Sequence, residues 1–156
     1  GDAHHLTDND PTGVAPARAM TMALEAAGRS PEDVDYINAH ATSTPTGDPN
    51  EVRAIKLALG ESVAAACPVS STKSMHGHCL GGAGGVESGI TALVIANDLI
   101  PGTINVDNLD PACAGLDHVL GTARPARVDL ALSNAFGFGG HNAVVALGRY
   151  EESGSA

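Results

Sequence analysis

The chain has no tryptophan, and only two Phe and two Tyr stand among its 156 residues. Basic residues are also scarce: 8 Lys and Arg oppose 18 Asp and Glu, for a formal net charge of −10. This charge disfavours nucleic acid and anionic membranes as partners. The apolar stretch at residues 89–100 is short for a membrane span and contains Asn97 and Asp98. No signal peptide is evident.

Cysteine is scarce as well, with Cys67, Cys79 and Cys113 and no CxxC spacing. The odd count disfavours a disulfide framework, and the spacing disfavours a structural zinc site. We therefore expect a reducing, cytoplasmic setting. Apolar residues make up 43% of the chain and glycines number 19, which predicts one globular core with tight loops.

Hydrophobic spacing predicts alternating strands and helices that end in two consecutive strands, an α/β layered sheet. Asp48 is the expected N-cap of the second helix, with Glu51 completing a capping box. The last helix is apolar almost all round, which predicts that it is buried. Helices are expected over 14–27, 48–59 and 83–98, and strands over 34–39, 68–70, 128–134 and 142–147.

Three loops with chemically active residues each follow a predicted strand. They carry His40, Lys73 with His78, and Phe138. In layered α/β sheets, sites lie in the crevice at the strand ends, so these loops are expected to meet. A neutral imidazole donates a hydrogen bond or accepts a proton, so two of them favour chemistry on a carbonyl. Taken alone, His40 is explained better as a loop histidine that caps the backbone.

The glycine-rich stretch at residues 77–85 raises the alternative of a nucleotide loop. The GxGxxG pattern fails because Glu87 stands where the last glycine is needed, and no glycine precedes a Lys-Ser or Lys-Thr pair. Tight packing at the start of a helix explains several of these glycines. A metal site at His76, His78 and Cys79 lacks a fourth ligand at a recognised spacing.

Two further residues have both a functional and a structural interpretation. Glu87 falls early in the apolar helix, where a buried carboxylate needs a partner, and Lys73 is the obvious one. A partly solvated Glu near a helix N-terminus is the alternative. Phe138 lies between two glycines, so it is either a gate whose N–H faces an oxyanion or a turn with one anchoring aromatic ring.

Together these motifs resemble the C-terminal half of a β-ketoacyl-acyl-carrier-protein synthase, a condensing enzyme of the thiolase fold. The similarity runs through nearly the whole chain to Tyr150, and TSTPTGD is more similar to fatty-acid elongating enzymes than to modular polyketide domains. The resemblance implies a mixed five-stranded sheet with a buried helix, in a domain over 1–150 and a tail over 151–156. The matching stretches are Gly1–Thr7, Tyr36–Asp48, Ser71–Glu87, Ile104–Pro111 and Leu132–Asn142.

The family resemblance also implies roles for individual residues. It implies a catalytic pair, His40 and His78, supported electrostatically by Lys73 with Glu87. It makes Phe138 the gatekeeper, with its N–H in the oxyanion hole. Residues implied to hold the phosphopantetheine arm of the carrier protein are Thr7, Thr42 and Thr44. Positions matching a monovalent cation site in some members are Asn38, Glu87, Ser133 and Asn134.

The resemblance implies an acyltransferase that needs no cofactor of its own, because phosphopantetheine arrives on the carrier protein. The expected partners are that carrier protein, an N-terminal ketosynthase half and a second copy in a homodimer. The nucleophilic cysteine of the family belongs to the N-terminal half, so this chain alone is expected to be inactive. An inner strand of the sheet is expected to precede Gly1.

The chain departs from the family pattern at two places. Cys79 stands where an apolar residue is common, and His76 replaces a Thr-like residue. The alternatives to a fatty-acid synthase are a non-catalytic ketosynthase-like partner subunit and a polyketide ketosynthase fragment. A true thiolase is disfavoured, because the last glycine loop, Ser133–Gly140, has no cysteine.

Overall fold

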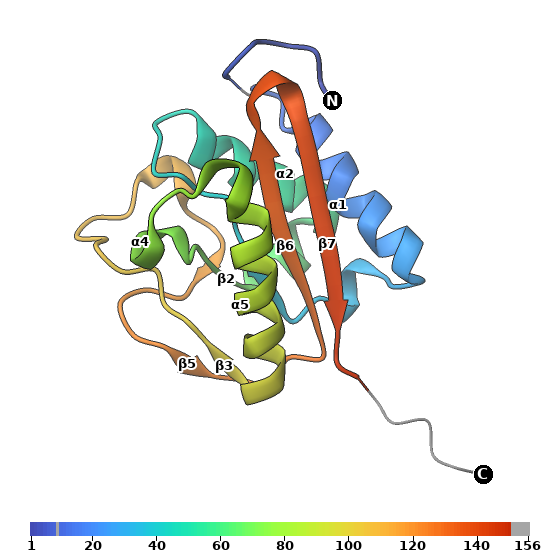
Figure 1. Ribbon diagram of the computed structural model, residues 1–156, viewed down its shortest axis with the longest axis vertical. Coiled ribbons are helices and arrows are strands. Elements are labelled where there is room, and N and C mark those ends of the chain that lie inside the picture. Colours follow the sequence, from blue (N-terminus) through green and yellow to red (C-terminus); the bar gives the residue numbers. More distant parts are fainter. Residues whose placement is uncertain (9, 151–156) are drawn as a thin grey trace.

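The computed structural model describes residues 1–8 and 10–150, so the expected tail lies outside the described residues. A five-stranded sheet crosses the molecule in the order β4-β2-β1-β6-β7 (Figure 1). The first four of these strands pair in parallel, and β7 is antiparallel to β6. This confirms the expected mixed sheet. Its strands are β1 (Tyr36–Asn38), β2 (Pro68–Ser70), β4 (Asp117–His118), β6 (Leu130–Gly137) and β7 (His141–Gly148).

Helices cover both faces of the sheet, with α5 on one face and α1, α2 and α3 on the other (Figure 1). Side-chain alternation assigns residues to these faces. Ile37 joins the core against α1 and α2, whereas its neighbour Tyr36 joins the core against α5. The helices are α1 (Val14–Ala27), α2 (Gly47–Leu59), α3 (Glu61–Ala66), α4 (Lys73–His76) and α5 (Ala83–Asn97). A small antiparallel ribbon joins β3 (Leu99–Ile100) to β5 (Arg124–Pro125).

The first helix follows from local signals in its sequence. Gly28 adopts the left-handed conformation, and its N–H bonds back to the last turn, which ends α1 at the predicted residue. Met20 and Leu24 face the core and are almost fully buried. The prediction of a helix over 14–27 is confirmed.

The predicted capping box at the start of the second helix is wrong. α2 begins at Gly47, and the Asp48 carboxylate accepts hydrogen bonds from the N–H groups of Ser43 and Thr44 in the preceding loop. Glu51 instead accepts from the backbone of the loop that follows β1. The sequence spacing suits a cap, but tertiary packing supplies both carboxylates with other donors.

The last predicted helix is only half buried. Glu87, Thr91 and Val94 face the sheet, whereas Val86 is 43% exposed and Leu93 is 62% exposed. The expectation of burial on all sides is therefore wrong for the residues described, because this chain covers α5 from one side only. None of the described helices has the length and apolar character needed to cross a membrane.

The expected gap in the sheet is also not found. β1 lies between β2 and β6 and is paired with both, and each neighbouring pair in the five-stranded order is hydrogen-bonded. An inner strand that precedes Gly1 is therefore not needed to complete this sheet, and that expectation was wrong. The face of α5 that carries Val86 and Leu93 points away from the sheet and is exposed in the part of the chain described.

Candidate active site

Two histidines from separate loops meet beyond the carboxyl ends of β1 and β2. The ring centroids of His40 and His78 lie 5.4 Å apart, with the ring planes at 85° to each other. The His40 ring also lies 5.8 Å from the ring of Phe136 on β6. The expected convergence of the two imidazoles is therefore present in the structure.

The loop that carries His40 is held by a buried carboxylate on α2. Glu51 is 4% exposed and accepts hydrogen bonds from the backbone N–H groups of His40 (2.9 Å) and Ala41 (2.7 Å). Asn134 on β6 donates a third through its side-chain amide, at 2.9 Å. Burial raises the pKa of Glu51, and the three donors partly offset that effect. This role of Glu51 was not predicted from the sequence, because it depends on contacts with segments that are distant along the chain.

Further hydrogen bonds fix the shape of the same loop. Asp48 accepts from the N–H groups of Ser43 at 3.0 Å and Thr44 at 3.3 Å. The hydroxyl of Ser71, beyond β2, donates to the carbonyl of Ala41 at 3.0 Å. Ser43 has a φ of 63°, a conformation that a non-glycine residue holds only when its surroundings impose it. The position of His40 is therefore determined within this chain.

His40 is an uncharged imidazole at neutral pH. Burial lowers its pKa to about 3, and the positive charge of Lys73 and the neighbouring His78 act in the same direction. A neutral imidazole keeps one N–H donor and one acceptor nitrogen. Its Nδ1 atom is buried and has no hydrogen-bond partner among the described residues. The ring is therefore suited to meet a carbonyl oxygen without adding a charge to the site.

A buried ion pair lies next to the two histidines. The Nζ atom of Lys73 lies 2.5 Å from the Oε1 atom of Glu87, and their side chains are 4% and 0% exposed. This contact confirms the predicted partner for the carboxylate of Glu87. It joins α4 to α5 across the glycine-rich segment, so it ties down both ends of the loop that carries His78. The pair holds a fixed positive charge near His40.

The loop that carries His78 is open to solvent. Within this loop, the Leu80 N–H donates a hydrogen bond to His78 Nδ1 at 3.2 Å. Gly77 has φ 75° and ψ −179°, a combination that glycine adopts far more readily than other residues. Leu80 has a φ of 50°, and its side chain is 65% exposed.

The proposed gate, Phe138, is also exposed, at 64%. It begins the turn at Phe138–Gly140 between β6 and β7, and the neighbouring Gly139 N–H donates to the carbonyl of Leu6 at 2.8 Å. The N-terminal segment therefore lies against this turn. Thr7 is exposed, and its hydroxyl lies 3.4 Å from His5 Nδ1.

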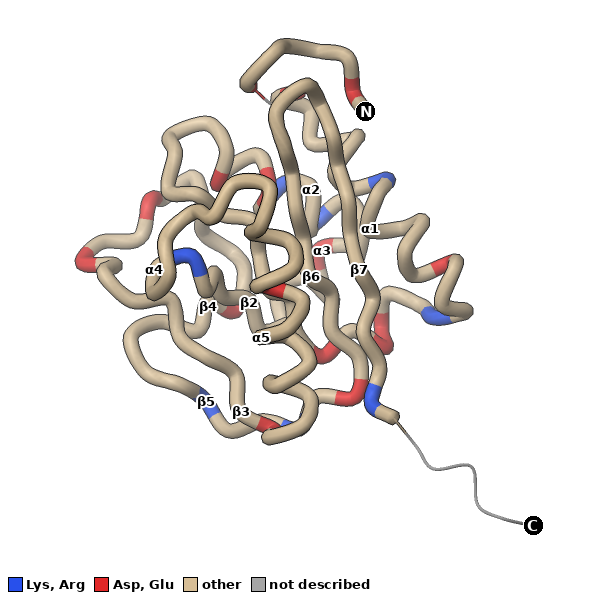
Figure 2. Tube along the Cα trace, viewed as in Figure 1, with Lys and Arg blue, Asp and Glu red and all other residues tan. Residues whose placement is uncertain are grey.

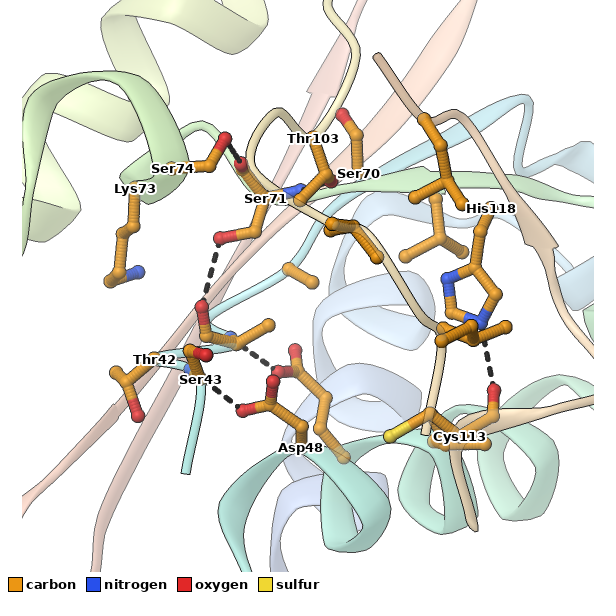
Figure 3. Close-up of a pocket in the computed structure, with 18 of the residues that line it drawn as sticks. Thr42, Ser43, Asp48, Ser70, Ser71, Lys73, Ser74, Thr103, Cys113 and His118 are labelled. Carbon is orange, nitrogen blue, oxygen red and sulfur yellow. Dashed lines mark hydrogen bonds between the residues drawn. The ribbon is translucent and has the colours of Figure 1, made fainter. Parts of the chain in front are cut away.

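A cavity of about 420 Å³ opens beside His78, and His40 is not among the residues that line it. Thr42, Lys73 and His78 contribute to its lining, and Cys113 and His118 lie on the far side (Figure 3). Thr44 is outside this lining; its hydroxyl accepts the N–H of Gly47 at 3.1 Å. Of the three threonines suggested for the phosphopantetheine arm, the structure therefore places only Thr42 on the cavity.

The four residues suggested for a cation do not point to one place. Asn38 and Ser133 are register partners on the face toward α5, where Glu87 pairs with Lys73. Asn134 points to the opposite face and donates to Glu51. Within residues 1–8 and 10–150, no group of three or more His, Cys, Asp or Glu side chains is arranged to hold a metal ion. Cation binding stays a prediction.

Comparison with known proteins gives a consistent result. The profile described as the β-ketoacyl synthase C-terminal domain matches residues 1–107. The chain is 53% identical over 150 residues to 3-oxoacyl-[acyl-carrier-protein] synthase 2 of Synechocystis, covering 96% of this chain and 36% of that protein. The enzyme of the same name from Staphylococcus aureus strain COL is 48% identical, with 97% of this chain and 36% of that protein covered.

The solved structures that are similar to this chain are also ketosynthases. A type II polyketide ketosynthase in complex with its acyl-carrier protein, AntDE:AntF, matches with a TM-score of 0.91 and 39% identity, covering 96% of this chain and 36% of that chain. A β-ketoacyl synthase from Burkholderia phymatum matches with a TM-score of 0.85 and 36% identity, covering 96% and 35%. The chain thus spans about a third of the length of these relatives. By its sequence and its thiolase-like fold, the chain belongs to the β-ketoacyl synthase family and represents its C-terminal domain.

Proposed function

We propose that the protein carries out decarboxylative condensation in fatty-acid elongation, joining a malonyl unit on an acyl carrier protein to an enzyme-bound acyl thioester. The observation that carries this proposal is the pair of imidazole rings, His40 and His78, with centroids 5.4 Å apart. Two imidazole N–H donors suit the oxygen of one thioester, which gains negative charge as the reaction proceeds.

In the proposed reaction, His40 and His78 donate hydrogen bonds to the thioester oxygen of the malonyl group. The carboxylate leaves as carbon dioxide, and its bonding electrons form an enolate that these donors stabilise. The enolate carbon then attacks the acyl thioester carbonyl and expels the cysteine thiolate. Burial keeps His40 uncharged, and Lys73, held by Glu87, acts in the same direction, so the ring is ready to donate rather than to form a cation.

In this proposal the substrate arm enters along the cavity that His78 lines. Thr42 lines it, and we assign Thr42, with Thr44 and Thr7 nearer the surface, to the phosphopantetheine arm. Phe138 would act as gatekeeper at the glycine turn, with its N–H toward the oxyanion of the acyl group. In this proposal the protein has no cofactor of its own.

The proposal requires an N-terminal ketosynthase half, which supplies the nucleophilic cysteine. Among the three cysteines here, Cys67 and Cys113 are buried and Cys79 is exposed, and none stands in the context of the family nucleophile. The exposed apolar face of α5, with Val86 and Leu93, is where we place that half. We further propose a homodimer in the cytoplasm that binds an acyl carrier protein.

The charge of this chain bears on that last partner. Acidic residues are spread along the whole chain trace and basic ones are few (Figure 2). A carrier protein that is itself acidic would gain little electrostatic attraction from this chain, so its docking contacts would lie chiefly outside it.

A second candidate is a polyketide ketosynthase or its non-catalytic partner. It is favoured by two structural relatives, the ishigamide ketosynthase/chain length factor at 37% identity and the AntDE:AntF complex at 39%. We prefer the fatty-acid assignment because this chain is more similar to the two 3-oxoacyl-[acyl-carrier-protein] synthase 2 enzymes, at 48–53% identity. A non-catalytic role is disfavoured because both imidazoles and the Lys73–Glu87 pair are in place.

The test separates the steps of the reaction in the full-length protein. His40→Ala should abolish decarboxylation of malonyl-carrier protein, a loss of roughly 100-fold or more, while acyl transfer to the cysteine continues. The exposed His4→Ala is the matched control and should leave both steps unchanged. Normal decarboxylation by His40→Ala would contradict the proposed role. Acylation of this chain without its N-terminal half, detected by intact mass, would contradict the assignment of the nucleophile.

A further inference from the structure

Ser71 lies between β2 and α4, and each of its polar groups is bound by a different part of the chain. Its N–H donates to the hydroxyl of Thr103 at 2.8 Å. Its hydroxyl donates to the carbonyl of Ala41, the residue after His40, at 3.0 Å. Its carbonyl accepts from the hydroxyl of Ser74 on α4 at 2.9 Å. Ser71 is 5% exposed and lies between Ser74 and Thr103 (Figure 3), so it is a buried junction between the His40 loop and α4.

The segment at residues 103–105 also binds α4 at a second place. The Ile104 N–H donates to the Ser74 hydroxyl at 3.0 Å, and the Asn105 side-chain amide donates to the Ser74 carbonyl at 3.3 Å. Asn105 has a φ of 64°, a left-handed conformation that a non-glycine residue keeps only where its surroundings impose it. The first turn of α4 is therefore tied to a segment that lies about thirty residues further along the chain.

The same segment is anchored to the sheet through its first residue. The Thr103 N–H donates to the Val119 carbonyl at 2.8 Å, and the Thr103 carbonyl accepts from the Gly121 N–H at 2.8 Å. Val119 is 2% exposed, and its N–H donates to the carbonyl of Val69 on β2 at 2.9 Å. The Thr103 hydroxyl is therefore carried by a backbone that is bound to β2, and all of these contacts are made within this chain.

The His40 loop is bound on both sides of Ala41. The carboxylate of Glu51 accepts the Ala41 N–H, and the Ser71 hydroxyl donates to the Ala41 carbonyl. Since Ser71 also binds α4, the distance between this loop and α4 depends on where Ser71 lies. Thr103 is the group that binds the Ser71 backbone from outside both segments.

We propose that Thr103, acting through Ser71, is a positioning residue for the condensation. It keeps the rings of His40 and His78 at the spacing that the reaction needs. Two N–H donors stabilise one developing oxyanion only when both lie about 2.7–3.1 Å from it. A misplacement of about 1 Å lowers the rate by about 100-fold. This inference rests on the proposed function, in which both imidazoles bind the oxygen of one thioester.

The experiment measures decarboxylation of malonyl-carrier protein by the full-length protein. Thr103→Val keeps the shape of the side chain and removes the hydroxyl, so kcat should fall by about tenfold or more. Thr103→Ser keeps the hydroxyl and should stay within about threefold of the parent protein. Thr122→Val, at an exposed threonine, is the matched control and should change kcat by less than about twofold. A Thr103→Val protein as active as the parent, or a Thr103→Ser protein as impaired as Thr103→Val, would overturn the proposal.

Because Thr103 lines the cavity, the kinetic constants must separate positioning from contact with the substrate. A hydroxyl that binds the substrate equally in the ground state and the transition state affects KM, whereas a positioning group affects kcat. We expect the KM for malonyl-carrier protein to change by less than about twofold in Thr103→Val. A raised KM with an unchanged kcat would contradict the positioning role and indicate a direct contact instead.

Two readouts need no turnover, so they separate this inference from the proposed function. In the full-length protein, Thr103→Val should speed amide hydrogen exchange at Ser71 by about tenfold or more, because that N–H loses its acceptor. The ring signals of His40 and His78 in NMR spectra should both shift, and Thr103→Ser should restore them. A parent protein that does not decarboxylate would contradict the proposed function alone. Unchanged exchange and ring signals in Thr103→Val would contradict the positioning role alone.

Ser71→Ala is a second variant that leaves Thr103 in place. It removes the bond to the Ala41 carbonyl, so kcat for decarboxylation should again fall by about tenfold or more. An unchanged kcat in Ser71→Ala would overturn the proposal, even if Thr103→Val proved unstable.

Discussion

The two histidine loops of this domain are built in opposite ways. The loop of His40 has its backbone N–H groups bound by Glu51 and Asp48, and its ring is largely buried against Phe136. The loop of His78 is exposed and rich in glycine, and the hydrogen bond at its histidine comes from within the same turn. One loop is held by hydrogen bonds to side chains of α2, and the other is exposed and held chiefly by its own turn.

This difference shows that the chain by itself fixes the position of His40 but leaves the loop of His78 exposed. The loop of His40 is set in position by Glu51 on α2, which Asn134 on β6 contacts, and by Ser71 after β2, and burial keeps His40 uncharged. The loop that carries His78 is constrained chiefly at its two ends, where the Lys73–Glu87 ion pair joins α4 to α5. A site of which one side is rigid and the other exposed is suited to completion by a second polypeptide surface.

The largest loss of stability is expected when the ends of the His78 loop are released from each other. Lys73→Met leaves Glu87 as an unpaired buried charge, and we expect a loss of about 3–5 kcal/mol in the free energy of unfolding. Urea denaturation measures it. The double variant Lys73→Met with Glu87→Leu is the control and should recover most of this loss, since apolar residues replace a buried pair at little cost. A single variant as stable as the parent would show that the pair does not secure this loop.

The next variant releases the His40 loop. Glu51→Leu removes the acceptor of two backbone N–H groups, and each such group left buried without a partner costs about 1–3 kcal/mol. We expect a loss of about 2–4 kcal/mol in the free energy of unfolding, together with faster amide hydrogen exchange at His40 and Ala41. Glu51→Gln, which keeps one acceptor oxygen, should lose less. Unchanged exchange at both amides in Glu51→Leu would contradict the role of this carboxylate.

A third prediction uses pH to distinguish the buried histidine from the exposed one. Because the pKa of His40 is lowered to about 3 in the fold, the unfolded chain takes up a proton below about pH 6.5 that the native state does not. Stability is therefore lost as pH falls. From about pH 7 to about pH 5, this histidine should contribute a loss of about 2 kcal/mol in the free energy of unfolding.

The measurement compares urea denaturation of the parent protein and His40→Gln at both pH values. The variant lacks the titrating group, so its stability should fall less over this range. If the two proteins respond to pH in parallel, His40 does not remain uncharged in the folded state.

The smallest effect is expected at the exposed loop. His78→Ala should change the free energy of unfolding by less than about 0.5 kcal/mol, because its side chain is exposed and its ring contact is with the half-buried His40. Under the proposed function, the same variant should abolish condensation in the full-length protein. Comparing thermal melts with condensation assays separates the two effects. A large loss of stability would show that this loop is as tightly integrated as the first.

Sequence reasoning succeeded where the controlling interactions are local. Helix α1 was predicted over its observed range, because Gly28 ends it through contacts within its own last turn. It failed at Glu51, where spacing suggested a cap and the true partners lie ten and eleven residues earlier in a loop. It also missed β4, because Asp117 and His118 form too short and polar a segment to indicate a strand.

The sequence by itself determined the family, the alternation of strands and helices, and the residue types at each strand end, because these depend on local spacing and on motif order. Only the tertiary structure decided that the two imidazoles meet, that His40 is uncharged, that Glu51 holds its loop, and that Ser71 binds Thr103. The physical reason is that burial and hydrogen-bond partners depend on which segments pack together, and that is not encoded at any single position.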